Sequence, residues 1–328
     1  MKRLLSLIGT VVLTMVFGVS SAFAQSENYL SIGDSLAAGQ TPYRQIDTGY
    51  SDLIAMRLGM TGQLSFYTKE LAFPGFTTAD VLKRVKSEEA SDLLANATLI
   101  TVSAGANDLL RLVQVNPTAG TLAFSQLQAD YALNVVRKNM VEILEELKVR
   151  APKAKIFVMG YYFAYPNVHA TQKEGTNAQL IKLNTILQQQ AEHAGATFVN
   201  VYDAFGLNAT NLLPNISDVH PNFEGYRQMA NAFLHVYSGS NALAISSNEL
   251  PKPNPISFEQ ILEQQEKAEQ KKEKEQEKEQ EKEQEKEQEQ EQEQEQEQEQ
   301  EKPSPAASII QGFTGYAAFM EKVRAILS

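Results

Sequence analysis

The sequence predicts an α/β fold in which helices cover both faces of a central parallel sheet. Short, nearly continuous apolar segments, rich in β-branched residues, occur at 29–32, 98–102, 156–159 and 197–201. Such segments are typical of strands that are buried on both faces. Longer segments with apolar residues at helical spacing lie between them, and strands that alternate with helices indicate a parallel sheet.

The predicted elements follow one another along residues 26–243. The strand at 29–32 is followed by a helix at 50–58, in which Leu53, Ile54 and Leu58 fall on one face. A less regular strand is predicted at 64–73. The remaining predicted helices each carry an apolar stripe and lie at 131–149, 177–193 and 222–237.

Composition excludes several kinds of site. The chain has 328 residues, of which 43% are hydrophobic, so it is long enough to bury a large core. It has no cysteine, which excludes disulfides, thiolate metal sites and a cysteine nucleophile. With only four histidines, a zinc site would need histidine and carboxylate ligands together, and no H-E-x-x-H motif is present.

The first 24 residues have the pattern of a secretory signal peptide. Two basic residues precede an apolar run at 4–17, and the small-residue site at 22–24 follows it. We expect cleavage after Ala24 and an exported, extracellular protein whose main domain spans 25–247. The alternative is a retained membrane anchor, for which the apolar run is short.

The negative charge of the chain is confined to one region. Residues 259–302 contain 19 glutamates and 8 lysines, which account for the whole net charge of −11. The remainder is neutral, so we expect no nucleic-acid partner. Residues 248–302 are predicted to form a Pro-containing linker and then a solvated, low-complexity Glu/Gln/Lys spacer. The amphipathic segment at 303–328 either docks on the main domain or contacts a partner or a surface, such as the cell surface.

Polar and small residues follow three of the predicted strands, where ligands bind in open parallel sheets. Ser35 lies in a Gly-Asp-Ser-Leu segment and is placed as a nucleophile if a base reaches it, although this segment also suits a turn or a helix N-cap. Gly75 offers a backbone N–H or forms an ordinary turn. Asn107, in a Gly-Ala-Asn-Asp segment, offers an amide donor to an oxyanion or caps a helix.

One histidine has the sequence context of a base. His220 directly precedes the helix predicted at 222–237 and is followed by a proline, which restricts its backbone. A histidine in this place alternatively caps the helix or lies in the core. Of the other histidines, His169 follows the aromatic segment at 161–165 and is the one that a pocket would include. No G-x-S-x-G motif occurs, which argues against an α/β-hydrolase.

Taken together and in this order, these segments resemble the GDSL, or SGNH, family of serine esterases and lipases, most of all its secreted bacterial lipase/acylhydrolases. The resemblance covers roughly residues 28–237. It implies the SGNH hydrolase fold, a flavodoxin-like three-layer α/β/α arrangement with a central parallel sheet. It also implies that Ser35 is the nucleophile and His220 the base. An oxyanion hole would then be formed by the N–H groups of Ser35 and Gly75 and the side chain of Asn107.

The sequence departs from the family pattern at the third member of the triad. The family usually places its acid three residues before the histidine, a position that Ser217 occupies here. Asp218 stands only two residues before His220. Either Asp218 still reaches the histidine ring, or a backbone carbonyl orients the ring instead.

The sequence therefore predicts a secreted serine esterase or lipase that hydrolyses carboxylic esters of small or lipid substrates. This chemistry implies no metal and no organic cofactor. The aromatic segment at 161–165 is too apolar for an ordinary exposed loop and is expected to contribute to an acyl pocket. One alternative is a carbohydrate O-acetyl esterase with the same site. Another is a surface- or spore-associated structural protein whose working part is the acidic tail. Acyl-chain length and oligomeric state stay open.

Overall fold

The computed structural model describes residues 26–257 and, beyond them, residues 259, 260, 263, 267, 270 and 274. The chain divides into two units between Phe258 and Glu259. The predicted leader at 1–24 and the amphipathic segment at 303–328 lie outside the described residues, so both stay predictions. No helix in the described part of the chain is long and apolar enough to cross a membrane.

A five-stranded parallel sheet forms the centre of the first unit. Its strand order is β3-β1-β4-β7-β8, so β3, the second strand of this sheet along the chain, lies at the edge beside β1. The sheet confirms the predicted fold class and all five predicted strands. Their bounds are β1 (Glu27–Gly33), β3 (Leu64–Ala72), β4 (Leu99–Ser103), β7 (Lys155–Met159) and β8 (Thr197–Val199).

Burial explains why some strands were easier to predict than others. Every residue of β4 is buried, as expected of a central strand with helices on both faces. The edge strand β3 mixes exposed and half-buried residues, and Phe66 is half exposed. Its sequence pattern is correspondingly weaker.

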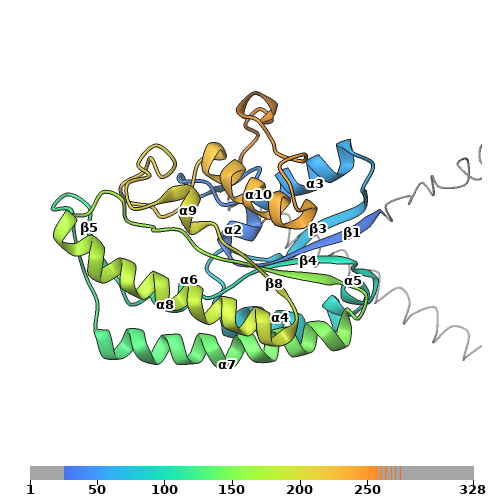
Figure 1. Ribbon diagram of the computed structural model, residues 1–328, viewed down its shortest axis with the longest axis horizontal. Helices are drawn as coiled ribbons and strands as arrows, with labels where there is room; N and C mark the ends of the chain where they lie inside the picture. The colour runs from blue at the N-terminus through green and yellow to red at the C-terminus, as the bar shows by residue number, and fades with distance from the viewer. Residues whose placement is uncertain are drawn as a thin grey trace, which may run out of the picture. The chain divides into compact units, whose positions relative to one another are not determined.

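Helices cover both faces of the sheet (Figure 1). One face carries α3 (Tyr50–Met60) and α10 (Phe223–Ser238), and the other carries α4 (Thr78–Lys86), α7 (Gln126–Arg150) and α8 (Ala170–Ala194). The four predicted helices are present, and the two longest begin five to seven residues earlier than predicted. Their apolar stripes face the sheet, where Leu53, Val136 and Phe233 are fully buried.

Several short elements complete the unit. They are α2 (Ser35–Ala38), α5 (Ser91–Asn96), α6 (Ala106–Leu110), α9 (Tyr202–Phe205), the 3₁₀ turns Glu88–Ala90 and Ser247–Glu249, and the antiparallel pairs β5 (Gln114–Asn116) with β6 (Thr121–Ala123) and β2 (Gln45–Ile46) with β9 (Ile256–Ser257). Elements of two to six residues have no measurable periodicity, so the sequence did not predict them. Two of them, α2 and α6, begin directly after the carboxyl ends of β1 and β4.

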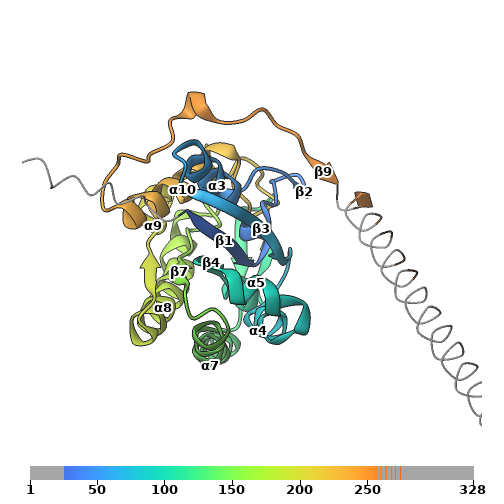
Figure 2. The same ribbon diagram turned by 90° about the vertical axis from the view of Figure 1, so that its right-hand side faces the viewer.

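The segment after α10 returns along the surface of the first unit (Figure 2). Glu249 accepts a hydrogen bond from the Arg57 guanidinium at 2.6 Å, which ties the segment to α3. Further along, the N–H of Asn254 donates to Asp47 at 2.9 Å, and β9 pairs with β2. The proline-containing stretch that was predicted to begin the linker therefore contacts the body as far as Ser257.

Candidate active site

Ser35 lies where β1 passes into α2. The turn requires Gly33, because its φ is 141° and a Cβ added there would lie 2.1 Å from the carbonyl oxygen of Ser103 on the neighbouring strand. Asp34 then caps α2, and its Oδ1 accepts the N–H of Leu36 at 3.0 Å. The Ser35 side chain is thus held at the carboxyl end of the sheet, where it is 7% exposed.

His220 approaches Ser35 from the loop before α10. Its Nε2 lies 2.7 Å from Oγ of Ser35, although 185 residues separate the two in the chain. On the other side of the ring, Nδ1 lies 2.7 Å from Oδ1 of Asp218. The same oxygen accepts the backbone N–H of His220 at 2.8 Å, which closes a tight turn between the two residues. An acid two residues before the histidine therefore reaches its ring.

The hydrogen bonds fix where the ring proton of His220 lies. A carboxylate oxygen can only accept, so a neutral imidazole beside Asp218 carries its proton on Nδ1. Nε2 is then an acceptor and faces the Ser35 hydroxyl, which can donate to it. This is the arrangement in which a histidine can remove a proton from a serine.

Asn107 is the second residue of α6, the short helix that follows β4. Its Nδ2 donates to the carbonyl oxygen of Phe76 at 2.9 Å. Because the amide has two hydrogens, this bond orients the other one. Asp108 is held by Thr78, whose N–H and hydroxyl donate to its two carboxylate oxygens at 2.9 and 2.8 Å. Burial raises the pKa of the Asp108 carboxyl despite these bonds.

Gly75 lies in the turn between β3 and α4. Its φ of 84° is in the left-handed region that favours glycine. Its carbonyl accepts a hydrogen bond from the Arg111 guanidinium at 3.0 Å. It borders the segment that anchors Asn107, but it does not line the cavity at Ser35 described below.

Asp34 and Tyr161 form a buried pair that also lines the cavity described below, and of the two the sequence indicated only Tyr161, in the aromatic segment predicted to form a pocket. Asp34 is 1% exposed, and its carboxylate accepts from Ser103 Oγ at 2.9 Å and from the Tyr161 hydroxyl at 2.5 Å. Burial raises the pKa of the Asp34 carboxyl, whereas these hydrogen bonds lower it in part. Burial and the neighbouring Asp34 also raise the pKa of Tyr161. The Gly-Asp-Ser-Leu segment suits a turn or a helix N-cap, but no sequence signal paired Asp34 with Tyr161.

Gln40 is another residue that the sequence did not indicate. It is buried, and its side-chain amide lies 3.2 Å from Nδ1 of His220. The backbone around it is well anchored, because its N–H donates to the carbonyl of Ser35 and its carbonyl accepts from the Tyr226 hydroxyl at 2.6 Å. The atom that faces Nδ1 is Nε2 of Gln40, which is a donor, so with the ring proton on Nδ1 the two can bond only when the amide is turned to present its oxygen.

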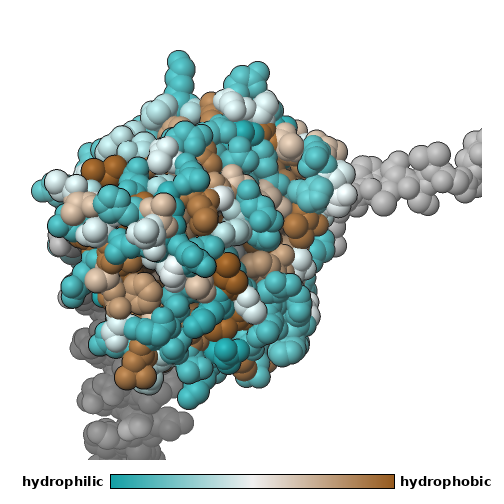
Figure 3. All heavy atoms as spheres, turned by 60° about the vertical axis from the view of Figure 1, so that its left-hand side comes forward, coloured by the Kyte–Doolittle hydropathy of each residue, from teal (hydrophilic) through white to brown (hydrophobic). Residues whose placement is uncertain are grey.

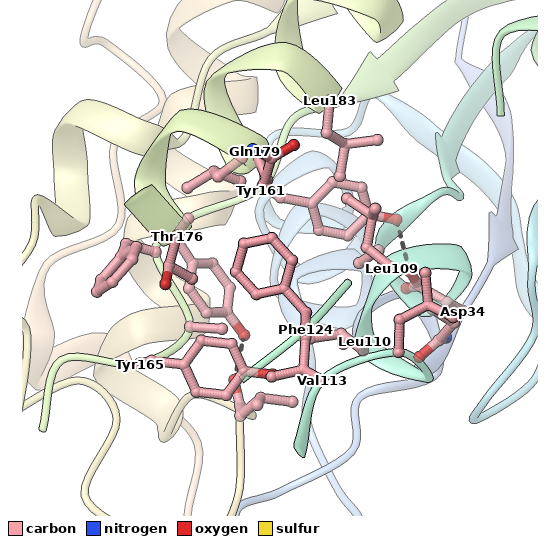
Figure 4. Close-up of a pocket in the computed structure, with 18 of the residues that line it drawn as sticks. Asp34, Leu109, Leu110, Val113, Phe124, Tyr161, Tyr165, Thr176, Gln179 and Leu183 are labelled. Atoms are coloured by element: carbon pink, nitrogen blue, oxygen red, sulfur yellow. Dashed lines mark hydrogen bonds between the residues drawn. The ribbon is translucent and has the colours of Figure 1, made fainter. Parts of the chain in front are cut away.

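Ser35, His220 and Asn107 line a cavity. Its walls are largely apolar, and the aromatic segment 161–165 forms one of them, with the side chains of Tyr161 and Tyr165 at the cavity in Figure 4. His169 does not line it. Instead, its backbone N–H donates to the carbonyl of Gly120 in the β5–β6 turn at 2.9 Å. Among the described residues, no group of three His, Asp or Glu side chains could hold a metal ion.

Comparison with known proteins gives one family. Residues 31–228 match the model of the GDSL-like lipase/acylhydrolase family. Among curated proteins, no sequence matches the chain.

One of the similar solved structures shares the fold at low sequence identity, and two others are more weakly similar. A lipase from a goat rumen metagenome is 18% identical, covers 66% of this chain and 100% of its own, and has a TM-score of 0.54. An acetylxylan esterase from Geobacillus stearothermophilus is 19% identical over 65% of this chain and 94% of its own, with a TM-score of 0.48. A phospholipase A1 from Streptomyces albidoflavus is 16% identical over 66% and 99%, with a TM-score of 0.47.

Proposed function

The chain belongs to the GDSL-like lipase/acylhydrolase family and is a carboxylic ester hydrolase, and we propose that it acts as an exported serine esterase with Ser35 as its nucleophile. The observation that carries the proposal is the continuous chain of contacts from Ser35 through His220 to Asp218, each 2.7 Å long. Ser35 and His220 both line a largely apolar cavity, in which an ester can reach the Ser35 hydroxyl.

In the proposed mechanism, Oγ of Ser35 attacks the ester carbonyl while Nε2 of His220 removes its proton. Asp218 stabilises the imidazolium that forms. When the tetrahedral intermediate collapses, the C–O bond to the alcohol breaks and His220 returns the proton to the leaving oxygen. Water, activated by the same histidine, then attacks the acyl-serine ester and releases the carboxylic acid and free Ser35.

The negative charge of the tetrahedral intermediate requires hydrogen-bond donors. The second hydrogen of Asn107 Nδ2 and the N–H of Ser35 suit this role, since the first residue of a helix has no intrahelical acceptor for its N–H. Gly75 is proposed as the third donor because it lies next to Phe76, whose carbonyl holds Asn107. Removal of one such donor typically lowers kcat by about 100- to 1000-fold.

Export of the protein is part of the proposal and rests on the leader pattern at residues 1–24. The chain would then act outside the cytoplasm, where its substrates are esters of the surroundings or of the cell surface. N-terminal sequencing of the protein from culture supernatant should begin at Gln25. Recovery of the uncleaved chain in the membrane fraction would contradict export.

The test of the nucleophile compares two serine-to-alanine variants. Ser35→Ala should lower the hydrolysis of p-nitrophenyl esters by at least about 1000-fold and abolish labelling by a fluorophosphonate. Ser125→Ala is the matched control, because Ser125 is exposed and lies outside the cavity, and it should retain full activity and labelling. Labelling of the Ser35→Ala variant at the wild-type rate would refute the assignment.

A further inference from the structure

The loop between α9 and α10, which lies toward the left of Figure 1, carries both Asp218 and His220. From 214 to 219 it contains no helix or strand and no buried residue, and Ile216 is 55% exposed. Figure 3 turns the left-hand side of Figure 1 forward and shows apolar residues there as scattered brown patches among polar ones. Since neither a backbone ladder nor apolar packing fixes this stretch, individual hydrogen bonds must hold it.

The peptide group between Val219 and His220 is held from both of its sides. The Tyr162 hydroxyl donates to the carbonyl of Val219 at 2.8 Å, and the N–H of His220 donates to Oδ1 of Asp218 at 2.8 Å. This peptide is planar and trans, so its C=O and N–H point in opposite directions. The bond from Tyr162 therefore fixes the direction of the N–H that Asp218 accepts. Because the same carboxylate oxygen meets Nδ1 of the ring, Tyr162 acts on the contact between acid and base.

Tyr162 is itself a rigid donor. Its side chain is buried, and its ring stacks on Phe205 with the centroids 4.2 Å apart and 13° between the ring planes. The backbone beside it is fixed by Asn184 of α8, which accepts the N–H of Tyr161 and donates to its carbonyl, both at 2.8 Å. Burial and two nearby carboxylates raise the pKa of Tyr162 well above its ordinary value, so the hydroxyl keeps its proton.

Asn215 holds the loop just before the acid. Its Nδ2 donates to the carbonyl of Pro42 in the loop after α2 at 2.7 Å, and its Oδ1 accepts the N–H of Ser217 at 3.0 Å. Its own carbonyl accepts the N–H of Asp218 at 3.1 Å. The backbone of Asp218 is thus anchored before the residue by Asn215 and after it by Tyr162.

We propose that Tyr162 is a positioning residue for the pair of Asp218 and His220, and that its bond to Val219, supported by Asn215, lets an acid two residues before the histidine complete the triad. The inference rests on the proposed function of Ser35. In this role the Tyr162 hydroxyl touches no reacting atom and acts through one peptide group. Its loss should therefore lower kcat and leave KM unchanged, because the ring that lines the cavity stays in place.

The test is Tyr162→Phe in the full-length chain, which removes the hydroxyl and keeps the ring. On p-nitrophenyl butyrate, kcat should fall about 5- to 30-fold with KM changed less than about twofold. Tyr29→Phe is the matched control, because Tyr29 is fully buried, its hydroxyl lies 2.9 Å from Oγ1 of Thr101 and it does not line the cavity. This control should lower the melting temperature and leave kcat unchanged.

A second measurement separates positioning from a merely structural role. In the Asp218→Asn background, Tyr162→Phe should lower kcat by less than about a further twofold, because residues that act through one another are not additive. The same fold-loss in both backgrounds, or an unchanged kcat in Tyr162→Phe alone, would overturn the proposal.

Asn215→Ala decides the question if Tyr162→Phe does not fold, because this loop residue is only half-buried. It should lower kcat at unchanged KM in the wild-type background and have little effect in the Asp218→Asn background. An unchanged kcat in Asn215→Ala would count against the proposal. Failure of the proposed function is different, since the wild type would then show no Ser35-dependent hydrolysis.

Discussion

Oδ1 of Asp218 accepts two hydrogen bonds from the same residue, one from Nδ1 of His220 at 2.7 Å and one from its backbone N–H at 2.8 Å. The backbone bond folds the carboxylate back toward the ring. This turn explains how an acid that stands only two residues before the histidine takes the place of one that stands three before it. It also leaves Ser217, at the usual position, without a role in the contact.

The first prediction concerns the charge of Asp218. Asp218→Asn keeps the size of the side chain but removes the charge that stabilises the imidazolium, so kcat should fall by at least about 1000-fold with little change in KM. Steady-state kinetics on p-nitrophenyl butyrate checks this. Asp203→Asn, on the exposed surface of α9, should leave kcat unchanged. A loss of less than about tenfold would show that the carboxylate is dispensable.

The second prediction concerns Gln40 as a positioning residue for His220. With the proton on Nδ1, the Gln40 amide stabilises the ring only if its oxygen faces Nδ1, an orientation that a half-turn of the amide provides. Gln40→Met removes this acceptor at similar volume and should lower kcat about 5- to 30-fold with little effect on KM. Gln190→Met, at a buried glutamine of α8 outside the cavity, should have no effect.

A rescue experiment separates positioning from a general structural role of Gln40. In the Asp218→Asn background, Gln40→Glu places a carboxylate near the same nitrogen and should restore at least tenfold of the lost kcat. Gln40→Met in that background should restore nothing. If the glutamate and methionine double variants were equally inactive, Gln40 would not act through His220.

The main architecture could be predicted because burial imposes a pattern on the sequence. Strands covered on both faces, such as β4, must be apolar throughout, and long helices such as α7 must carry a stripe. The four residues of α2 and the two of β9 are too short for any period. The pairing of β9 with β2 also joins residues about 210 positions apart, which no local signal reports.

The residues of the site also divide into those that the sequence indicates and those that only the fold brings together. Ser35, Asn107 and His220 stand in segments of distinctive composition, so the sequence could single them out and a resemblance could order them. Whether Asp218 reached the ring depended on a turn geometry that spacing alone did not settle. Gln40 and the Asp34–Tyr161 pair became visible only in three dimensions, because each is an ordinary residue whose importance comes from the neighbour that the fold gives it.

The third prediction concerns the buried bond between Tyr161 and Asp34. Tyr161→Phe leaves a buried carboxylate oxygen without its donor and should lower the free energy of unfolding by about 1–3 kcal/mol. Tyr165→Phe is the matched control, since the Tyr165 hydroxyl has no hydrogen-bond partner among the described residues, and it should change stability by less than about 0.5 kcal/mol. Urea unfolding at neutral pH measures both, and equal losses would contradict the prediction.

The same variant should show a defined pH dependence. Burial raises the folded-state pKa of Asp34 above its ordinary 3.8, so the folded state binds the proton more tightly than the unfolded state does. The contribution of Asp34 to the free energy of unfolding therefore falls as the pH rises from 3.8 through the raised pKa. Above the raised pKa this contribution is constant. Tyr161→Phe raises that pKa further. The loss of unfolding free energy in Tyr161→Phe, relative to wild type, should accordingly be largest well above the raised pKa. It should shrink toward pH 4.

The last prediction concerns where the hydrolase can be shortened. A chain that ends at Ser257 keeps β9 and the bond from Asn254 to Asp47, whereas one that ends at Leu250 loses both. The chain that ends at Ser257 should match the full chain in kcat and KM on a soluble ester. The reason is that residues 259–302, which it lacks, carry the whole net charge of −11, whereas the site lies in the neutral remainder of the chain. The second should melt several degrees lower, at roughly 2–4 °C for each kcal/mol lost.

The chain that ends at Leu250 should also affect the active site indirectly. Ile46 of β2 forms a bridge with Gln40, so loss of β9 should loosen the strand that borders Gln40. We therefore expect the chain ending at Leu250 to lose kcat to a degree no greater than Gln40→Met does, with KM unchanged. A large fall in kcat already in the chain ending at Ser257, at unchanged melting temperature, would instead mean that residues beyond 257 help to build the active site.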